Sequence, residues 1–175
     1  MALTLTLRER PAVPLEAEAL TPDGVAPLRR AEIEALTVWE GNRRARVGDF
    51  FAVSGEVGDE LRIEGDLGRV KFLGAGMESG RLTVAGSAGM HAGAGMRGGE
   101  LVVEGDVGDF AGVGMCGGRL VVRGSAGDHL GAGGAIVAGS DPEAELEEML
   151  LKARPLLETV GGTLEAGRGV AAAHR

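Results

Sequence analysis

The side chains best suited to metal binding or nucleophilic chemistry are His91, His129 and the single cysteine, Cys116. The two histidines occupy equivalent positions of a repeated pattern, two repeats apart, with Phe110 midway between them. Repeats that stack as strands about 4.8 Å apart would separate the imidazoles by roughly 10 Å, too far to ligate one zinc ion. Cys116 lies in another column of the pattern, and no base is predictable beside it. We therefore predict no catalytic residue and no metal site, but surface histidines and a buried or half-buried thiol.

Two glycine motifs match the dinucleotide-binding pattern G-x-G-x-x-G, at residues 93–98 and 112–117. That fingerprint needs a helix that begins inside the motif and receives the pyrophosphate on its N-terminus. Here a β-like segment begins within three residues, and the motif recurs in each repeat. We interpret these glycines as chain turns and predict no cofactor-binding site.

Aspartates recur at the same turns: Asp66, Asp106, Asp109 and Asp128. Carboxylates at turns commonly accept hydrogen bonds from nearby backbone N–H groups. No two of them can be identified as a pair for acid–base catalysis. The pattern predicts caps for the turns.

A repeat organises the sequence between Leu61 and Gly133. Leu82, Leu101 and Leu120 open successive units 19 residues apart, and the unit that opens at Leu61 is longer by two residues. Each unit has a short apolar segment followed by glycines in four columns, where sharp corners and close stacking leave no room for a side chain. These predicted turn glycines are Gly65, Gly68, Gly74, Gly76, Gly86, Gly89, Gly93, Gly95, Gly105, Gly108, Gly112, Gly114, Gly124, Gly127, Gly131 and Gly133.

The elements that carry these residues follow from the repeat. A period near 20 residues is too short to hold a helix, and the alternation of Leu101 and Val103 with Val102 and Glu104 is typical of a half-buried strand. Equivalent leucines and valines would stack as inward columns. We therefore predict an all-β protein, a parallel β-helix, over residues 50–138.

The flanking segments differ from the repeat. Residues 1–49 predict a lead-in and cap: an opening strand at 3–7, a turn at 21–24, a short helix at 31–36, and two strands joined by a tight turn at 41–42. Residues near 50 resemble an imperfect first repeat. Residues 139–175 predict a C-terminal α-helix, capped by Ser140 and Glu143, and a tail. We expect the apolar face of that helix to cover the open end of the repeat.

Composition and charge exclude some classes of binding partner. The net charge is −8, aromatics make up 3%, and there is one Trp and no Tyr. A nucleic acid or an anionic membrane is therefore an unsuitable partner. One cysteine excludes an internal disulfide framework. The sequence shows no secretion signal and no long apolar run, which predicts a cytoplasmic protein.

Two features suggest contact with another protein. Met77, Met96 and Met115 form a ladder at one corner, which would either fill the core or provide an adaptable apolar strip for a partner. Trp39 would either cover the first turn of the repeat or contact a partner.

Several motifs together resemble a known family. The unit G-x-G-M-x-x-G, the segment VWEGNR at 38–43, the run GDLGRVK at 65–71 followed by GAGM at 74–77, and the stretch GMHAGAGM at 89–96 resemble the C subunit of formylmethanofuran dehydrogenase. They are similar also to its bacterial counterpart, the C subunit of the formyltransferase/hydrolase complex. The glycine repeat alone resembles the GXGXG domain of the large subunit of glutamate synthase. The Trp-x-Gly-Asn-Arg segment and the N-terminal lead-in favour the first family.

The resemblance implies a right-handed β-helix that acts as a non-catalytic scaffold without a cofactor of its own. It would pack against a metal-dependent, amidohydrolase-like subunit and a formyltransferase subunit in one-carbon metabolism linked to tetrahydromethanopterin and methanofuran. The family's repeat usually continues for several turns beyond the position of Gly133, so partner surfaces carried by those turns would be missing. Two alternatives stay open: an accessory domain of a glutamate-synthase-like amidotransferase, and a small-molecule enzyme with His91, Arg97 or Cys116 in a concave pocket.

Overall fold

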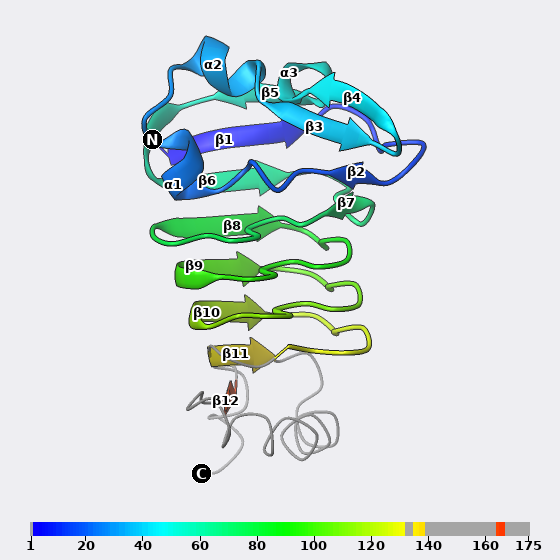
Figure 1. Ribbon diagram of the computed structural model, residues 1–175, viewed down its shortest axis with the longest axis vertical. Coiled ribbons are helices and arrows are strands. Elements are labelled where there is room, and N and C mark those ends of the chain that lie inside the picture. The colour runs from blue at the N-terminus through cyan, green and yellow to red at the C-terminus, as the bar shows by residue number, and fades with distance from the viewer. Residues whose placement is uncertain (1, 132–134, 139–163, 167–175) are drawn as a thin grey trace.

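The computed structural model describes residues 2–131, 135–138 and 164–166 of the 175-residue chain. These residues form an eight-stranded sheet and a four-stranded sheet. The strands of the larger sheet follow one another along the long axis, and the helices gather at the N-terminal end (Figure 1). The order of the larger sheet is β12-β11-β10-β9-β8-β6-β1-β5, and that of the smaller sheet is β4-β3-β2-β7.

The repeat builds the parallel part of the larger sheet. Its strands are β6 (Glu56–Glu64), β8 (Arg81–Ala85), β9 (Arg97–Val103), β10 (Gly117–Val122) and β11 (Ala135–Ala138). Leu61, Leu82, Leu101 and Leu120 are register partners across this series, and each is at most 1% exposed. The inward column expected from the 19-residue period is thus confirmed.

The turns between these strands also pair with their neighbours. Ala88, Val107 and Ala126 form successive parallel bridges. Farther along each turn, the backbone N–H of Gly93 donates to Leu73 O and that of Gly112 donates to Ala92 O, each at 2.8 Å. Hydrogen bonds between turns offset part of the large conformational entropy that glycine loses on folding.

The start of the sheet differs from the expectation that residues near 50 begin the repeat. Strand β1 (Ala2–Leu7) lies parallel to β6 and places Leu3 opposite Leu61, so the first strand of the chain extends the leucine column. Strand β5 (Phe51–Ser54) lies antiparallel on the other side of β1, with Leu7 opposite Phe51. The expected opening strand is present, but it takes the place assigned to the imperfect repeat.

The smaller sheet contains the predicted pair of strands and two segments from elsewhere. Strands β3 (Thr37–Glu40) and β4 (Arg43–Arg46) are antiparallel and joined through Gly41, which has a φ of 58°. Glycine adopts this left-handed conformation without steric cost. Strand β2 (Leu15–Glu16) pairs antiparallel with β3 and parallel with β7 (Val70–Lys71).

Three short helices cover the N-terminal end: α1 (Pro22–Val25), α2 (Arg30–Glu34) and α3 (Val47–Phe50). The side chain of Thr21 accepts a hydrogen bond from Gly24 N at 3.1 Å, and Glu32 accepts one from Arg29 N at 2.7 Å. Such caps satisfy backbone donors that a helix start leaves unpaired. Each helix buries one apolar side chain or more, including Ile33, which is fully buried.

The predicted class, an all-β right-handed parallel β-helix with a C-terminal α-helix, is wrong. Both sheets contain antiparallel as well as parallel pairs, and short helices are part of the fold, so the structure is a mixed α/β arrangement. The physical reason is that residues 1–55 carry no 19-residue period. The turn at Gly41 and the reversal of β5 against β1 impose antiparallel pairs there.

The predicted C-terminal helix lies outside the described residues. Residues Leu164–Ala166, which the sequence assigns to a tail, form β12, parallel to β11. Among the helices of the described residues, none is both long and apolar enough to cross a membrane.

Candidate partner interface

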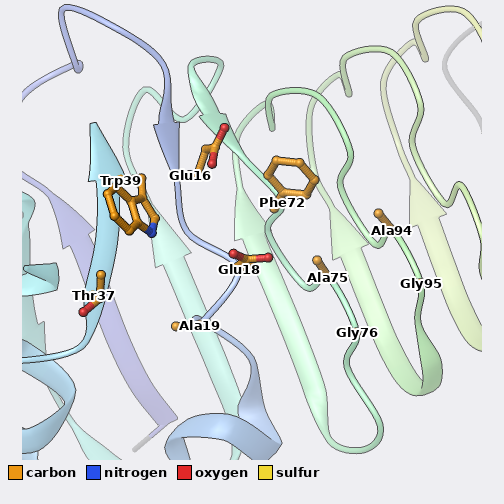
Figure 2. Close-up of a pocket in the computed structure, with 10 residues that line it drawn as sticks. All are labelled: Glu16, Glu18, Ala19, Thr37, Trp39, Phe72, Ala75, Gly76, Ala94 and Gly95. Atoms are coloured by element: carbon orange, nitrogen blue, oxygen red, sulfur yellow. The ribbon is translucent and has the colours of Figure 1, made fainter. Parts of the chain in front are cut away.

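A groove with a volume of about 610 Å³ lies where the smaller sheet meets the turns that follow β7 and β8. Figure 2 shows Trp39 on one side, Phe72 on the other, and the carboxylates of Glu16 and Glu18 between them. The remaining lining residues are small or lie at the edge: Ala19, Thr37, Ala75, Gly76, Ala94 and Gly95. The groove therefore combines two aromatic rings and two acidic groups with a floor of small residues that includes Ala75 and Ala94.

Strand β3 positions Trp39. Its register partners are Glu16 on β2 and Arg44 on β4, and the indole is on the exposed side, with 41% of the residue accessible. The Arg44 guanidinium donates to Thr37 Oγ1 from Nε at 3.2 Å and from Nη2 at 3.0 Å. An exposed tryptophan held between two paired strands provides a fixed contact surface.

The opposite wall, Phe72, belongs to a column of stacked rings. The centroid of Phe72 lies 4.7 Å from that of His91, His91 lies 5.1 Å from Phe110, and Phe110 lies 4.9 Å from His129. All four residues have φ near 61°, which is uncommon for residues other than glycine. Backbone bonds hold this conformation: Phe72 N donates to Met90 O at 3.0 Å. The phenyl wall is therefore supported from below by the next turn.

The acidic groups of the groove have no ion-pair partner among the described residues. Glu16 is half-buried, Glu18 is exposed, and neither belongs to the ion pairs that those residues form. Lys71 is the register partner of Glu16 on β7. Arg43, at the hairpin, is bound by Glu40, and this hydrogen bond raises the pKa of the guanidinium. The groove thus presents two carboxylates to whatever enters it.

The predicted methionine ladder lies in the core. Met77 and Met96 are fully buried and Met115 is 3% exposed. This placement agrees with core filling and leaves Trp39 as the accessible member of the residues considered for a partner interface.

His91, His129 and Cys116 do not line the groove, although His91 stacks on Phe72. Cys116 is exposed, so the expectation of a buried or half-buried thiol is wrong, and its Sγ lies 3.7 Å from Met96 O. His129 is exposed as expected, whereas His91 is half-buried and its Nδ1 is buried without a hydrogen-bond partner among the described residues. No group of three or more His, Cys, Asp or Glu side chains in the described part of the chain could hold a metal ion.

The turn glycines serve two different needs. Gly95 has a φ of 65° and open space where a Cβ would point, so its conformation alone favours glycine. Gly89 lacks a positive φ, but a Cβ there would lie 2.6 Å from Val70 O. Glycine is favoured at Gly95 by the conformation of its own backbone, and at Gly89 by the close approach of the neighbouring turn. Gly133 lies outside the described residues.

Two of the four aspartates predicted as caps, Asp106 and Asp109, cap the turns of the next repeat, as expected. Asp106 Oδ1 accepts from Ser125 N at 2.7 Å, and Asp109 Oδ1 accepts from Asp128 N at 2.8 Å. Asp66 instead pairs with Arg10 at 3.5 Å. The carboxylates of Asp106 and Asp109 therefore link successive turns.

The fold is similar to that of a chain in a multi-subunit enzyme of known structure. That chain belongs to the crystal structure of the formyltransferase/hydrolase complex from Methylorubrum extorquens in complex with methylofuran, and the match has a TM-score of 0.72 and 31% sequence identity. It covers 77% of this chain and 55% of that chain.

Curated relatives narrow the resemblance to one type of subunit. The C subunit of the molybdenum-containing formylmethanofuran dehydrogenase 1 from Methanosarcina barkeri is 45% identical over 84 residues, which cover 45% of this chain and 28% of the relative. The C subunit of the tungsten-containing formylmethanofuran dehydrogenase 2 from Methanothermobacter thermautotrophicus is 41% identical over 94 residues, covering 51% and 35%. The resemblance to the C subunit of this enzyme is therefore confirmed, and the chain spans about a third or less of the length of these relatives.

A family model described as chorismate binding enzyme matches residues 119–158. This stretch is less than half of the chain, and only residues 119–131 and 135–138 of it are described by the structure.

Proposed function

We propose that the chain is a scaffold subunit of a formylmethanofuran dehydrogenase or formyltransferase/hydrolase complex and that it binds protein partners without catalysing the reaction itself. The observation that carries the proposal is the structural match to a chain of such a complex over 77% of this chain. The confirmed resemblance to the C subunit supports the same assignment.

The groove beside Trp39 supports a role in protein binding. An exposed indole, a phenyl ring and alanines beside acidic side chains agree with the composition of protein interfaces, which are enriched in aromatic residues and bounded by polar groups. We propose that the partners are a metal-dependent, amidohydrolase-like subunit and a formyltransferase subunit, and that the scaffold holds no cofactor of its own.

Coexpression tests the proposal. The tagged chain is produced with the hydrolase and formyltransferase subunits of its own host, and the products are separated by size-exclusion chromatography. We expect one complex that contains all the subunits and no formate release from formylmethanofuran by the isolated chain. Omission of the chain should reduce the yield of that complex.

Three outcomes contradict the proposal. Formate release by the chain alone would make it an enzyme. Assembly of the other subunits in equal yield and stability without the chain would exclude a scaffold role. Copurification with glutamate-synthase subunits instead would support the accessory-domain hypothesis.

A further inference from the structure

The groove contains charge and aromatic surface that core packing does not require. Glu16 and Glu18 lie between Trp39 and Phe72 (Figure 2), and neither forms an ion pair with a described residue. Packing of β2 against its neighbours needs no acidic side chain at these positions, because the buried residues of that segment are Leu15 and Ala17. The acidic pair is therefore available to a ligand.

We propose that this groove receives an arginine side chain from a neighbouring subunit. The inference rests on the proposed function, since it assumes that a partner polypeptide lies on this face. It adds the chemistry of the contact: a guanidinium between the indole and the phenyl ring, paired with the carboxylates of Glu16 and Glu18.

Charge complementarity favours a cation. The whole chain carries a net charge of −8, and Arg43 is held by Glu40. Arg44 donates to the neutral hydroxyl of Thr37 and Lys71 lies opposite Glu16, but neither of these cations forms an ion pair with Glu16 or Glu18. An anion in the groove would bring like charges together at the two glutamates. A positive side chain would instead gain two carboxylates that no described residue neutralises.

The shape of the groove favours arginine over lysine. A guanidinium is planar, stacks on aromatic faces and donates a fork of hydrogen bonds to carboxylates, whereas a lysine ammonium is a compact and strongly hydrated charge. The aliphatic part of an arginine side chain would lie along the alanines of the floor, Ala75 and Ala94.

Both aromatic walls are held before any partner binds. Phe72 stacks on His91 with a centroid distance of 4.7 Å, and Ala75 N donates to Phe72 O at 3.0 Å. Trp39 lies on a strand that is paired on both sides, by β2 and by β4. A preformed site loses less entropy on binding than one that must order itself.

The single tryptophan makes a direct assay possible. Trp39 is the only Trp and there is no Tyr, so intrinsic indole fluorescence reports on this groove alone. The probe is N-acetyl-arginine amide, titrated into the full chain at low salt. The neutral isostere N-acetyl-citrulline amide and the lysine analogue serve as comparisons.

We expect a saturable change in fluorescence with the arginine probe, a weaker one with lysine and none with citrulline. The double substitution E16Q/E18Q should raise the Kd about twofold to thirtyfold, because it removes two exposed ion pairs that contribute about 0.2–1 kcal/mol each. The control E9Q/E34Q removes the same charge from exposed glutamates outside the groove and should leave the Kd unchanged. An equal response to arginine and citrulline, or an equal effect of both double variants, overturns the inference.

A substitution of Trp39 tests the contribution of the aromatic wall to binding. Trp39→Leu should weaken binding about twofold to fivefold, from a cation–π contact of about 0.5–1 kcal/mol, followed through the backbone amide NMR shifts of Ala75 and Ala94. Val57→Ala, which shortens an exposed apolar side chain on β6, is its matched control. An affinity equal to that of the wild type in Trp39→Leu contradicts the stacked arrangement.

The assembled complex separates this inference from the proposed function. If E16Q/E18Q lowers recovery of a partner subunit and E9Q/E34Q does not, the groove is the partner contact. If the complex forms equally well with both variants, the arginine inference fails and the scaffold proposal stands. If the wild-type chain recruits no subunit at all, the scaffold proposal fails, and the inference of an arginine from a neighbouring subunit fails with it.

Discussion

Substitution by alanine should lower the free energy of unfolding about three times as much at Gly89 as at Gly95, for reasons visible in the structure. Gly95 has a φ of 65° and nothing within 4 Å of the position that a Cβ would take, whereas at Gly89, which lacks a positive φ, a Cβ would lie 2.6 Å from Val70 O and 2.9 Å from Val70 C. The first substitution strains one residue, and the second pushes against a backbone that also pairs with Leu15.

The magnitudes follow from these two situations. A non-glycine residue in the left-handed region costs about 1–2 kcal/mol, and the stiffer unfolded chain returns about 0.4–1 kcal/mol, so Gly95→Ala should cost about 1 kcal/mol. Gly89→Ala should cost about 3 kcal/mol, the upper end for overpacking, because the backbone rather than a flexible side chain must move.

Thermal unfolding followed by circular dichroism measures both. At this chain length a loss of 1 kcal/mol lowers Tm by about 2–4 °C, so Gly95→Ala should lower Tm by that amount and Gly89→Ala by about three times as much. Gly95→Asn should cost less than Gly95→Ala, since Asn tolerates positive φ. Equal losses at Gly95 and Gly89 would refute the reasoning that close stacking, and not conformation alone, selects glycine at the second site.

Other substitutions test the ring column, the core and the thiol. Phe110→Gly should be more stable than Phe110→Ala by about 1 kcal/mol in thermal unfolding. Both variants lose the stacking on His91 and His129, but only glycine relieves the strain of the positive φ. The reverse order of stability would show that the backbone at this residue is not strained. Leu101→Ala, at a fully buried site, should cost about 2–5 kcal/mol in urea unfolding. Val102→Ala, at the neighbouring half-buried site, should cost about 1 kcal/mol. Cys116 should react with a thiol reagent in the native protein at the rate of an exposed thiol, and labelling only after denaturation would show that it is shielded.

The parts of the fold that depend on the repeat could be predicted from sequence, because each repeat specifies its own neighbours. Leu82 and Leu101 are partners as the 19-residue spacing requires, and Asp106 caps the following turn. The strand pair around Gly41 was also predictable from its local turn chemistry.

The groove could not be predicted, because it depends on pairing between segments far apart in the sequence. Glu16 meets Trp39 through β2 and β3, and it meets Lys71 through β2 and β7. The sequence feature that could have indicated the groove is the extra length of the first repeat. The extra residues fall between Gly68 and Gly74, where Val70 and Lys71 form β7, the strand of the smaller sheet that lies between β6 and β8 in the chain.

The ring column left a clearer trace in the sequence. His91, Phe110 and His129 share one position of the repeat, and Phe72 precedes them by the same 19 residues. Bulky rings that recur at one position of a repeat otherwise rich in glycine indicate that these rings stack on one another. Periodicity shows that these residues are equivalent, but it does not show their backbone conformation.

The parallel series from β6 to β10 sets distances along the molecule in equal steps. Each repeat adds one strand, and the register between Leu82, Leu101 and Leu120 is the same at each step. Removal of one whole 19-residue unit would shorten the protein by about one strand spacing, roughly 4.8 Å, and leave the remaining contacts of the same kind. Insertion or removal of whole repeats can therefore change the distance from the Trp39 groove to a surface on a later repeat only in steps of that size. The number of repeats between two partners bound at those places would set the distance between them.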